Sequence, residues 1–416
     1  MNICFFSIVT YWHGGKGGME IHGKILCEGL VERGHEVTII STRHPNGKEY
    51  EEVNGIKIYC LAETGFSTYW KKWGKESLKK FDQLNRMKSF DIVLSQSFNG
   101  YYFAKNKKKY QIPLVSFLQG AGPYMTISKI KLAVQRRHHT SIAEVIRLLL
   151  SYIVHYFILH LPTVLGSDLI ICASDHVNDS LRKWYPVRRE KIYTIMNGID
   201  TLGFSPDDKD RNRIRKHLGV REGESLLMTS GTISKEKGHH LAIEALNKLL
   251  EKNVNLKLMI VGDGEYLTSL SRLIDKFGLK KRIILTGFVP NKSIGNYYNA
   301  ADIYLIPTLR AEGLPFALIE AMSIGLPIIA SKAGGISNVV KDGKDGLLIN
   351  PGDTNDMVSK ILILLRNKNL REELGVKARQ KVLNELNSEN MVNRTLNVIE
   401  SNLFAVKNKS SSEIYS

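Results

Sequence analysis

The sequence predicts an α/β protein made of two doubly wound lobes of similar size. Short apolar runs rich in β-branched residues alternate with helix-length segments, a pattern typical of parallel βαβ units. The same alternation starts again in the second half of the chain. The length of 416 residues also exceeds what one hydrophobic core usually holds, so two domains are expected.

The apolar runs give the expected strands in chain order. In the first half they are residues 2–9, 37–41, 56–61, 92–95, 114–117, 169–173 and 192–195. In the second half they are residues 226–229, 256–261, 283–286, 303–306, 328–330 and 346–349. Ligands of open α/β sheets bind at the carboxyl ends of the strands. Two such lobes are therefore expected to face one another across a central cleft.

A turn-rich polar stretch marks the expected domain boundary. We place an N-terminal domain at residues 1–196, a linker at 197–209 and a C-terminal domain at 210–388. The helical stretch at about 389–404 follows the completed second lobe, and we expect it to pack back on the first. Residues 405–416 are expected to form a flexible tail.

The cysteines and the N-terminus predict a cytoplasmic protein. Cys4, Cys27, Cys60 and Cys172 are widely separated, without a C-x-x-C pair or a histidine at ligand spacing, so we expect buried reduced thiols and no metal. The first apolar run, residues 3–9, has no leading basic segment and is too short for a signal peptide. Secretion is therefore not expected.

The charge favours an anionic partner. The chain has 58 Lys and Arg against 41 Asp and Glu, and residues 68–150 alone contain 16 basic and four acidic side chains, a local net charge of +12. An apolar, aromatic run at 148–161 follows; it is closed by Pro162 and is shorter than a comfortable membrane span. A basic stretch beside an apolar helix fits a protein that lies on an anionic membrane surface.

Two alternatives to a membrane surface would also account for the charge. A buried connector helix with ordinary solvated lysines would give the same pattern. Nucleic acid is the competing anion, but the sequence contains no recognisable helix-turn-helix, zinc finger or RNA-binding aromatic motif. We therefore expect no nucleic-acid partner.

Two glycine-rich loops follow strands and open helices. The first ends in Gly17 and Gly18, where backbone amides and a helix start would approach a phosphate. The second runs from Gly231 through Thr232 to Lys237, and the lysine would neutralise a departing diphosphate. Taken alone, the first loop is as consistent with a structural turn, and the second with a solvated Lys/Glu turn.

Two carboxylates flank the end of the strand at 303–306. Glu312 lies in the loop after the strand, and Glu320 lies in the second turn of a helix that begins near Pro315. Carboxylates accept hydrogen bonds from hydroxyls, so the pair suits a sugar and a ribose. Glu320 could instead only support its helix. A glycine turn at 333–336 is expected to add amides to the same phosphate site.

These segments resemble glycosyltransferase family 4. The run from Glu312-Gly-Leu-Pro to Glu320-Ala-Met has the E-x7-E pattern of retaining GT-B glycosyltransferases. The other matching motifs, in chain order, are Gly-Gly-Met-Glu at 17–20, Asn-Gly-Ile-Asp at 197–200, Gly-Asp-Gly-Glu at 262–265, Thr-Gly-Phe-Val at 286–289, Ile-Ile-Ala-Ser at 328–331 and Asp-Gly-Lys-Asp-Gly-Leu-Leu at 342–348. The resemblance covers nearly the whole chain and implies the GT-B fold, which consists of two Rossmann-like lobes. It also implies that the N-terminal domain binds the acceptor and the C-terminal domain binds the nucleotide sugar.

The resemblance also implies roles for single residues. Glu312 would hold the hydroxyls of the donor sugar, Glu320 the nucleotide ribose, and Lys237 the diphosphate. The implied donor is a nucleotide sugar, UDP- or GDP-linked, used without a metal or other cofactor. The donor-binding residues implied in this way are Gly17, Gly18, Thr232, Lys237, Gly287, Val289, Glu312, Gly313, Leu314, Phe316, Ala317 and Glu320.

The chain departs from the family pattern at two positions. Thr232 stands where the family usually has an arginine, so one of two cationic diphosphate ligands is missing; Lys235 and Arg310 are candidates to replace it. Gln119 stands where the family commonly has a histidine facing the sugar. Glutamine can hydrogen-bond a sugar hydroxyl but cannot transfer a proton. Gln119, Lys237 and Glu312 are the catalytic candidates.

The resulting hypothesis is a retaining glycosyltransferase of polysaccharide or lipopolysaccharide biosynthesis. It would move a hexose or N-acetylhexosamine to a hydroxyl of a lipid-linked or polysaccharide acceptor, as a peripheral protein at the cytosolic face of the membrane. A soluble transferase acting on a sugar or sugar phosphate and a non-catalytic nucleotide-sugar-binding protein are the alternatives. A nicotinamide dehydrogenase is disfavoured, because the first glycine loop lacks the G-x-G-x-x-G pattern and no acidic residue closes the second strand at Ser41.

Overall fold

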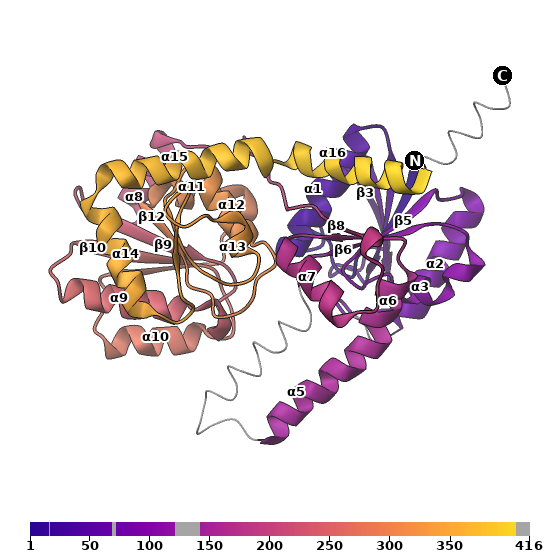
Figure 1. Cartoon of the computed structure of the whole chain (residues 1–416), viewed down its shortest axis with the longest axis horizontal. Coiled ribbons are helices and arrows are strands. Elements are labelled where there is room, and N and C mark those ends of the chain that lie inside the picture. Colours follow the sequence, from indigo (N-terminus) through magenta and orange to yellow (C-terminus); the bar gives the residue numbers. More distant parts are fainter. Residues whose placement is uncertain (16, 69–71, 121–141, 405–416) are drawn as a thin grey trace. The chain divides into compact units, whose positions relative to one another are not determined.

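The computed structural model divides into two compact units (Figure 1). It describes residues 1–15, 17–68, 72–120 and 142–404. Unit 1 contains the described residues up to Asn197 together with those from Ser388 onward, and unit 2 is Gly198–Asn387. The predicted tail at 405–416 lies outside the described residues. Each unit is an α/β fold with its own central sheet.

Unit 1 has a sheet of eight strands in the order β3-β4-β2-β1-β5-β6-β7-β8. Every strand pair is parallel except β3 with β4. The strand order reverses between β1 and β5, which makes this the topological switch point of the unit. The strands are β1 (Asn2–Phe6), β2 (Glu36–Thr42), β3 (Tyr50–Val53), β4 (Ile56–Leu61), β5 (Ile92–Gln96), β6 (Leu114–Leu118), β7 (Leu169–Cys172) and β8 (Ile192–Thr194).

Strand β3 is an element that the apolar runs did not predict. It pairs antiparallel with β4, with Tyr50 opposite Tyr59 and Val53 opposite Ile56. The connecting residues Asn54 and Gly55 both have positive φ, 51° and 75°. Asn-Gly in this conformation is a strong hairpin signal. Strand β3 was missed because its short sequence, Tyr-Glu-Glu-Val, lacks an apolar run.

Helices cover both faces of the unit 1 sheet. One face packs against α1 and α16, with Leu26, Leu30 and Val392 in its core. The other face packs around Phe6, Trp73 and other large side chains. The helical segments are α1 (Gly18–Glu32), α2 (Trp73–Met87), α3 (Tyr101–Asn106), η1 (Lys107–Lys109), α5 (Ile142–His155), η2 (Tyr156–His160), α6 (Leu161–Gly166), α7 (Asp175–Trp184), η3 (Arg189–Lys191), α16 (Ser388–Ile399) and η5 (Glu400–Phe404).

Unit 2 has a fully parallel sheet of six strands in the order β11-β10-β9-β12-β13-β14. Numbered from β9, this is the 3-2-1-4-5-6 order of a dinucleotide-binding fold, with its switch point between β9 and β12. The strands are β9 (Ser225–Ser230), β10 (Leu256–Val261), β11 (Ile283–Gly287), β12 (Ile303–Ile306), β13 (Ile328–Ser331) and β14 (Leu347–Ile349).

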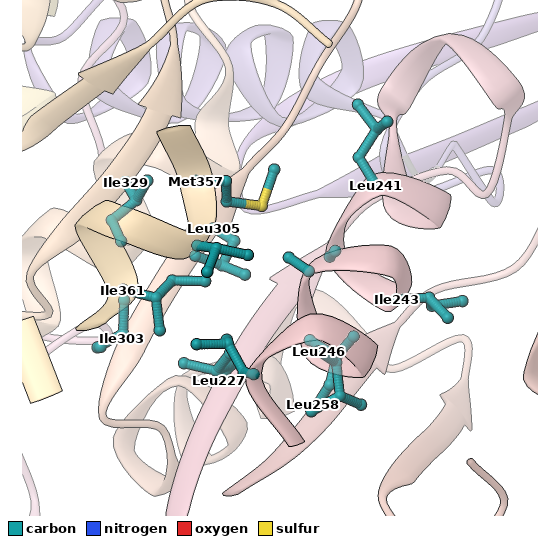
Figure 2. Close-up of a cluster of buried hydrophobic side chains, with 14 of the residues drawn as sticks. Leu227, Leu241, Ile243, Leu246, Leu258, Ile303, Leu305, Ile329, Met357 and Ile361 are labelled. Atoms are coloured by element: carbon teal, nitrogen blue, oxygen red, sulfur yellow. The ribbon is translucent and has the colours of Figure 1, made fainter. Parts of the chain in front are cut away.

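The core of unit 2 lies between the sheet and the helices α9, α10 and α14. Figure 2 shows Leu227, Ile303 and Leu305 of the sheet facing Leu246 of α9 and Ile361 of α14. The helices α11, α12 and α15 also contact one another or the sheet. The helical segments are α8 (Asp208–His217), η4 (Lys235–Lys237), α9 (His239–Leu250), α10 (Leu267–Lys276), α11 (Asn291–Ala300), α12 (Phe316–Ile324), α13 (Ile336–Val339), α14 (Thr354–Arg366) and α15 (Lys368–Glu385).

The expected linker at 197–209 packs largely on unit 2. Ile199 and Phe204 are buried. The carbonyl oxygen of Phe204 accepts a hydrogen bond from Ser323 Oγ at 2.7 Å, and the N–H of Ile199 donates to the carbonyl of Leu386 at 3.0 Å. These contacts bind the segment to α12 and to the end of α15, so the chain leaves unit 1 close to Asn197.

Candidate active site

The candidate site in unit 2 lies at the switch point of its sheet. The loop after β9 and the loop after β12 both leave the carboxyl edge of adjacent central strands. The first loop ends in the turn η4, and the second leads into α12. At a switch point, the helices that follow the two central strands cover opposite faces of the sheet. A ligand can therefore bind between the two loops that lead into those helices.

Lys237 and Glu312 meet at this point. Lys237 Nζ lies 2.9 Å from Glu312 Oε1. The hydroxyl of Thr308 donates to the same oxygen at 3.1 Å. Lys237 was expected at the start of a helix; it ends η4, directly before Gly238 and α9. The two catalytic candidates of unit 2 therefore form one ion pair.

Arg310 supplies a second cation to the same carboxylate. Its Nε lies 3.0 Å from Glu312 Oε1 and its second terminal nitrogen 3.3 Å from Oε2. Its other terminal nitrogen donates to Glu236 at 2.6 Å. Lys235 and Arg310 are the candidates to replace the arginine missing at position 232. Of these two, Arg310 lies beside Lys237 on the Glu312 carboxylate. Two cations, Lys237 and Arg310, and two carboxylates, Glu312 and Glu236, therefore form one connected group of ion pairs at the switch point.

Glu312 is ionised in this environment. Burial by itself raises the pKa of a carboxyl group, but here Lys237 and Arg310 outweigh it and lower the pKa of Glu312 to about 2. Oε1 already accepts three donors, whereas Oε2 accepts one. Oε2 therefore has more remaining capacity to accept a ligand hydroxyl.

Two glycines allow the loops of the site to pack closely. Gly238 has φ +76°, and a Cβ there would lie 1.9 Å from the carbonyl oxygen of Pro307. Gly334 has φ +62°, and a Cβ there would lie 2.2 Å from the carbonyl oxygen of Glu312. The N–H of Gly335 donates to that oxygen at 2.9 Å. The glycine turn at 333–336 therefore supports the Glu312 backbone, and its Gly335 amide is not directed to a phosphate as expected.

The start of α12 presents backbone amides next to Glu312. Gly313 and Leu314 are buried in the approach to the helix, and the helix begins at Phe316. The N–H of Leu318 is already bonded to the carbonyl of Pro315 at 3.1 Å. The N–H groups of Phe316 and Ala317 precede it in the first turn, where helix geometry provides no acceptor. This end of the helix favours an anion.

Glu320 lies in a separate, buried environment. Tyr298 donates to its Oε2 at 2.9 Å, and Asn291 donates to its Oε1 at 3.1 Å. Burial raises the pKa of Glu320 to about 7, although both hydrogen bonds lower it. Glu320 is therefore fixed by neighbours on α11 and does more than support its own helix.

The remaining donor-site candidates of unit 2 lie at loop positions. Thr232 is exposed after β9, and its carbonyl accepts from the ring of buried His239 at 3.4 Å. Gly287 ends β11 with φ +70° and Val289 is half-buried. Asn291, the neighbour of Glu320, follows this loop as the first residue of α11. The expected base-binding loop is thus connected directly to Glu320.

The glycine loop of unit 1 lies at the start of α1. Gly17 precedes the helix and Gly18 is its first residue. Burial raises the pKa of Glu20, and hydrogen bonds from the N–H groups of Glu20 and Gly17 to its carboxylate oppose this rise. A diphosphate at this helix start would therefore compete with Glu20 for the Gly17 amide. The sequence reasoning did not identify this role of Glu20.

Gln119 follows β6 in unit 1. Its Oε1 accepts a hydrogen bond from Asn197 Nδ2 at 2.8 Å. This bond orients the amide, and it links the end of β6 to Asn197, the residue at which the chain leaves unit 1 for unit 2. With Oε1 engaged, the amide NH2 is the group that Gln119 can offer to a hydroxyl oxygen.

Unit 1 also contains a cluster of His13, His44 and Glu51, whose candidate ligand atoms lie within 4.8 Å of one another. Hydrogen bonds account for it. His13 Nε2 lies 3.0 Å from Glu51 Oε1, and its Nδ1 lies 3.5 Å from Cys60 Sγ. His44 Nδ1 accepts from the N–H of Asn46 at 2.9 Å, so a neutral His44 holds its proton on Nε2. The cluster ties the loop after β1 to β3 and β4.

Sequence reasoning missed Asn291, Tyr298 and Thr308 as parts of the candidate site, and it named Arg310 only as an option. Tyr298 and Asn291 lie about 20 to 30 positions before Glu320 in the chain, and nothing in their spacing indicates a contact with it. Arg310 and Thr308 lie in the same loop as Glu312, which was the available signal. Their contact with Glu312 depends on how the loop turns back on itself.

Family comparisons cover most of the chain. Residues 16–201 match the model of glycosyltransferase family 4, and residues 210–381 match that of glycosyl transferases group 1. An uncharacterized glycosyltransferase of Methanocaldococcus jannaschii is 25% identical over 92% of this chain and 94% of its own length. The alpha-monoglucosyldiacylglycerol synthase of Streptococcus pneumoniae is 25% identical over 77% of this chain and 69% of its own.

Solved structures show the same fold. Sucrose-phosphate synthase of Thermosynechococcus elongatus has a TM-score of 0.79 at 19% identity, covering 98% of this chain and 100% of its own. HepE of Anabaena, in complex with UDP and glucose, has a TM-score of 0.76 at 18% identity, covering 96% and 100%. The two family models make the chain a glycosyltransferase of the family 4 type, and the solved structures show that its fold is GT-B.

Proposed function

We propose that this glycosyltransferase is a retaining enzyme that uses a nucleoside-diphosphate sugar, UDP- or GDP-linked. It would transfer a hexose or N-acetylhexosamine to a hydroxyl of a lipid-linked or polysaccharide acceptor at the cytosolic face of a membrane. The main support is the meeting of Lys237 and Arg310 on Glu312 beside the start of α12. Cations and helix amides at one point suit a diphosphate, and a carboxylate with unused acceptor capacity suits a sugar.

In this reaction the cations and helix amides would stabilise the departing nucleoside diphosphate. The bond between the anomeric carbon and the diphosphate oxygen breaks, and the acceptor oxygen forms the new bond. The acceptor proton leaves with the diphosphate, on which negative charge develops. Lys237, Arg310 and the amides of Phe316 and Ala317 would stabilise this charge.

Transfer is tested by incubating the full chain with UDP- and GDP-sugars and a membrane fraction that supplies acceptors. We expect release of the nucleoside diphosphate together with a labelled product whose anomeric configuration matches that of the donor. A product of opposite configuration would refute retention. A donor that binds but stays intact would favour the non-catalytic binding protein.

The membrane part of the proposal rests on the helical stretch Ile146–Gly166. Within the described residues it is the one helix of sufficient length and apolarity to cross a bilayer, at 21 residues, so it is longer than the apolar run predicted from sequence. Its exposed large apolar side chains form a stripe with spacings of three and four residues: Ile146, Leu149, Leu150, Ile153, Val154 and Phe157. Such a stripe is typical of a helix that lies in a membrane interface.

Basic side chains lie on elements next to this stretch. Figure 1 shows α2, α3 and α6 next to one another in unit 1, with α5 extending from them. Lys75 and Lys79 on α2, Lys105 on α3 and Lys108 on η1 are exposed. A cationic region beside an apolar stripe favours an anionic lipid surface over a neutral one. The lipid product named for the Streptococcus relative agrees with an acceptor located there.

Vesicle sedimentation separates the membrane proposal from the soluble alternative. We expect the full chain to pellet with phosphatidylglycerol vesicles and to stay in solution with phosphatidylcholine vesicles. The double variant Ile153→Glu/Phe157→Glu should remain in solution with both. Leu202→Glu, which changes an apolar side chain that is 87% exposed in unit 2, is the matched control and should pellet like the wild type. A wild-type chain that stays in solution would favour the soluble transferase.

A further inference from the structure

Four side chains of metal-binding types meet in unit 1. His13 lies in the loop after β1, His44 lies in the loop after β2, Glu51 lies in β3 and Cys60 lies in β4. The two histidines and Cys60 are buried, and Glu51 is half-buried. Without a metal, hydrogen bonds hold these groups together. Imidazole, thiolate and carboxylate are the ligand types that zinc takes in proteins.

The sheet brings these residues together although they are far apart in the sequence. The strands that carry or precede them are neighbours in the order β3-β4-β2-β1. Glu51 pairs with Ile58 across the β3–β4 hairpin. Cys60 lies two positions beyond Ile58, so Glu51 and Cys60 face the same side of the sheet. Spacing along the chain therefore does not indicate a metal site here, and none was expected.

The distances within the cluster are close to those of a tetrahedral site. Zinc binds nitrogen, oxygen and sulfur at about 2.0 to 2.3 Å, so neighbouring ligand atoms of a tetrahedron lie about 3.3 to 3.6 Å apart. His13 Nε2 lies 3.0 Å from Glu51 Oε1 and 3.7 Å from Cys60 Sγ. The candidate ligand atoms of His13, His44 and Glu51 all lie within 4.8 Å of one another. Small side-chain shifts would therefore place all four ligands around one ion.

Metal binding would cost the cluster one exposed hydrogen bond. His44 Nδ1 accepts from the N–H of Asn46 at 2.9 Å. Coordination by Nδ1 would use the same lone pair, and coordination by Nε2 would move the ring proton to Nδ1, so either displaces that bond. Asn46 is exposed, so water can accept from its N–H instead. The Cys60 thiol would lose its proton to solvent as the sulfur–metal bond forms.

A buried serine beside Cys60 supports a ligand at this place. Ser41 of β2 is the register partner of Cys60, so the two side chains face the same side of the sheet. Ser41 is 1% exposed, and among the described residues its Oγ has no hydrogen-bond partner. Such an unpaired buried hydroxyl is costly. A metal-bound thiolate on the neighbouring strand would give this hydroxyl an acceptor.

We propose that His13, His44, Glu51 and Cys60 bind one zinc ion as a structural site. Four protein ligands leave no open position for water or substrate, so the site is not catalytic. Its role is to fix the loop that begins the approach to α1, because it ties His13 to the β3–β4 hairpin. The inference is independent of the proposed transfer reaction.

The test measures metal binding by the full chain after dialysis against a chelator. Zinc is titrated in competition with a chromophoric chelator, and cobalt(II) is used as a spectroscopic substitute. We expect one tightly bound ion per chain, visible cobalt bands of the intensity typical of tetrahedral geometry, and a near-ultraviolet charge-transfer band from the Cys60 thiolate. Zinc should also raise the thermal midpoint, because the assembled site exists only in the folded state.

Single variants test the ligands. Glu51→Gln, His44→Gln and Cys60→Ala each remove one ligand, and each should weaken zinc binding by at least about 10-fold. Cys60→Ala should also abolish the charge-transfer band. Two controls should bind both metals like the wild type. His217→Gln changes an exposed histidine of unit 2, and Cys27→Ala removes another buried thiol of unit 1.

The outcomes decide the proposal directly. A wild-type chain that binds no stoichiometric zinc would refute it, and so would an unchanged affinity in Glu51→Gln and Cys60→Ala. Loss of binding in His217→Gln would place the ion elsewhere on the protein surface. A cobalt complex without the sulfur band would exclude Cys60 as a ligand and refute the site as proposed. Because Glu51 is only half-buried, its variant keeps the test open even if the substitution of a buried ligand prevents folding.

Discussion

The environment of Glu320 makes a quantitative prediction about stability that requires no substrate. Glu320 is 4% exposed, and its pKa is raised from 4.5 to about 7. Replacing it by glutamine keeps the size of the side chain and removes the charge. We expect Glu320→Gln to stabilise unit 2 at pH 8 and to have little effect near pH 4.5.

The magnitude and sign follow from proton linkage. Below pH 4.5 Glu320 is protonated in both states and contributes nothing. Between pH 4.5 and about 7 the folded state keeps a proton that the unfolded state loses, so the wild-type free energy of unfolding falls as pH rises. One pKa unit corresponds to about 1.4 kcal/mol, so ionised Glu320 costs the folded state about 3 kcal/mol above pH 7.

The assay must report on unit 2 separately. All four tryptophans lie outside residues 198–387, so tryptophan fluorescence has no probe within unit 2. Hydrogen exchange detected by mass spectrometry gives the opening free energy of the amides in β9 and β12. Wild type and Glu320→Gln are compared at several pH values from 5 to 8. Glu222→Gln, a change at an exposed position of the same unit, controls for the loss of one negative charge.

The variant should gain opening free energy relative to wild type as pH rises, reaching a difference of about 3 kcal/mol at pH 8, while Glu222→Gln shows no comparable trend. A difference between Glu320→Gln and wild type that is constant with pH would contradict the reasoning. It would mean that burial does not disfavour the ionised form of Glu320.

Two further predictions concern the loops around Glu312. Gly334→Ala should destabilise unit 2 by more than about 1 kcal/mol, because its Cβ would lie 2.2 Å from the Glu312 carbonyl oxygen. The control in the same exchange experiment is Gly343→Ala, which has a similar φ but no atom within 4 Å of the added Cβ. Equal effects of the two substitutions would refute the packing argument. Lys237→Ala should lower turnover of a nucleotide sugar by about 100-fold. Because Lys237 pairs with buried Glu312, the variant should also unfold at a lower thermal midpoint. Turnover within threefold of wild type would remove Lys237 from the mechanism.

Much of the fold and part of the candidate site were predictable from the sequence. The strand runs of both units were found because parallel strands are buried on both faces and appear as continuous apolar segments. Glu312, Glu320 and Lys237 could be named as candidates because each lies in or near a loop after a strand, at the edge where open α/β sheets bind ligands. Strand β3 was not predicted, because its sequence has no run of apolar residues. The contacts of the Glu20 carboxylate were not predicted either, because a hydrogen bond to a backbone amide leaves no pattern in the sequence.

The sequence alone determined the class of fold and the edge of each sheet at which the candidate residues lie. These follow from local patterns, which depend on neighbours a few positions apart. Only the tertiary structure decided that Arg310 joins Lys237 on one carboxylate, and that Glu320 is held by Tyr298 and Asn291. Those contacts join segments brought together by sheet order and loop packing, and spacing along the chain has no relation to such distances.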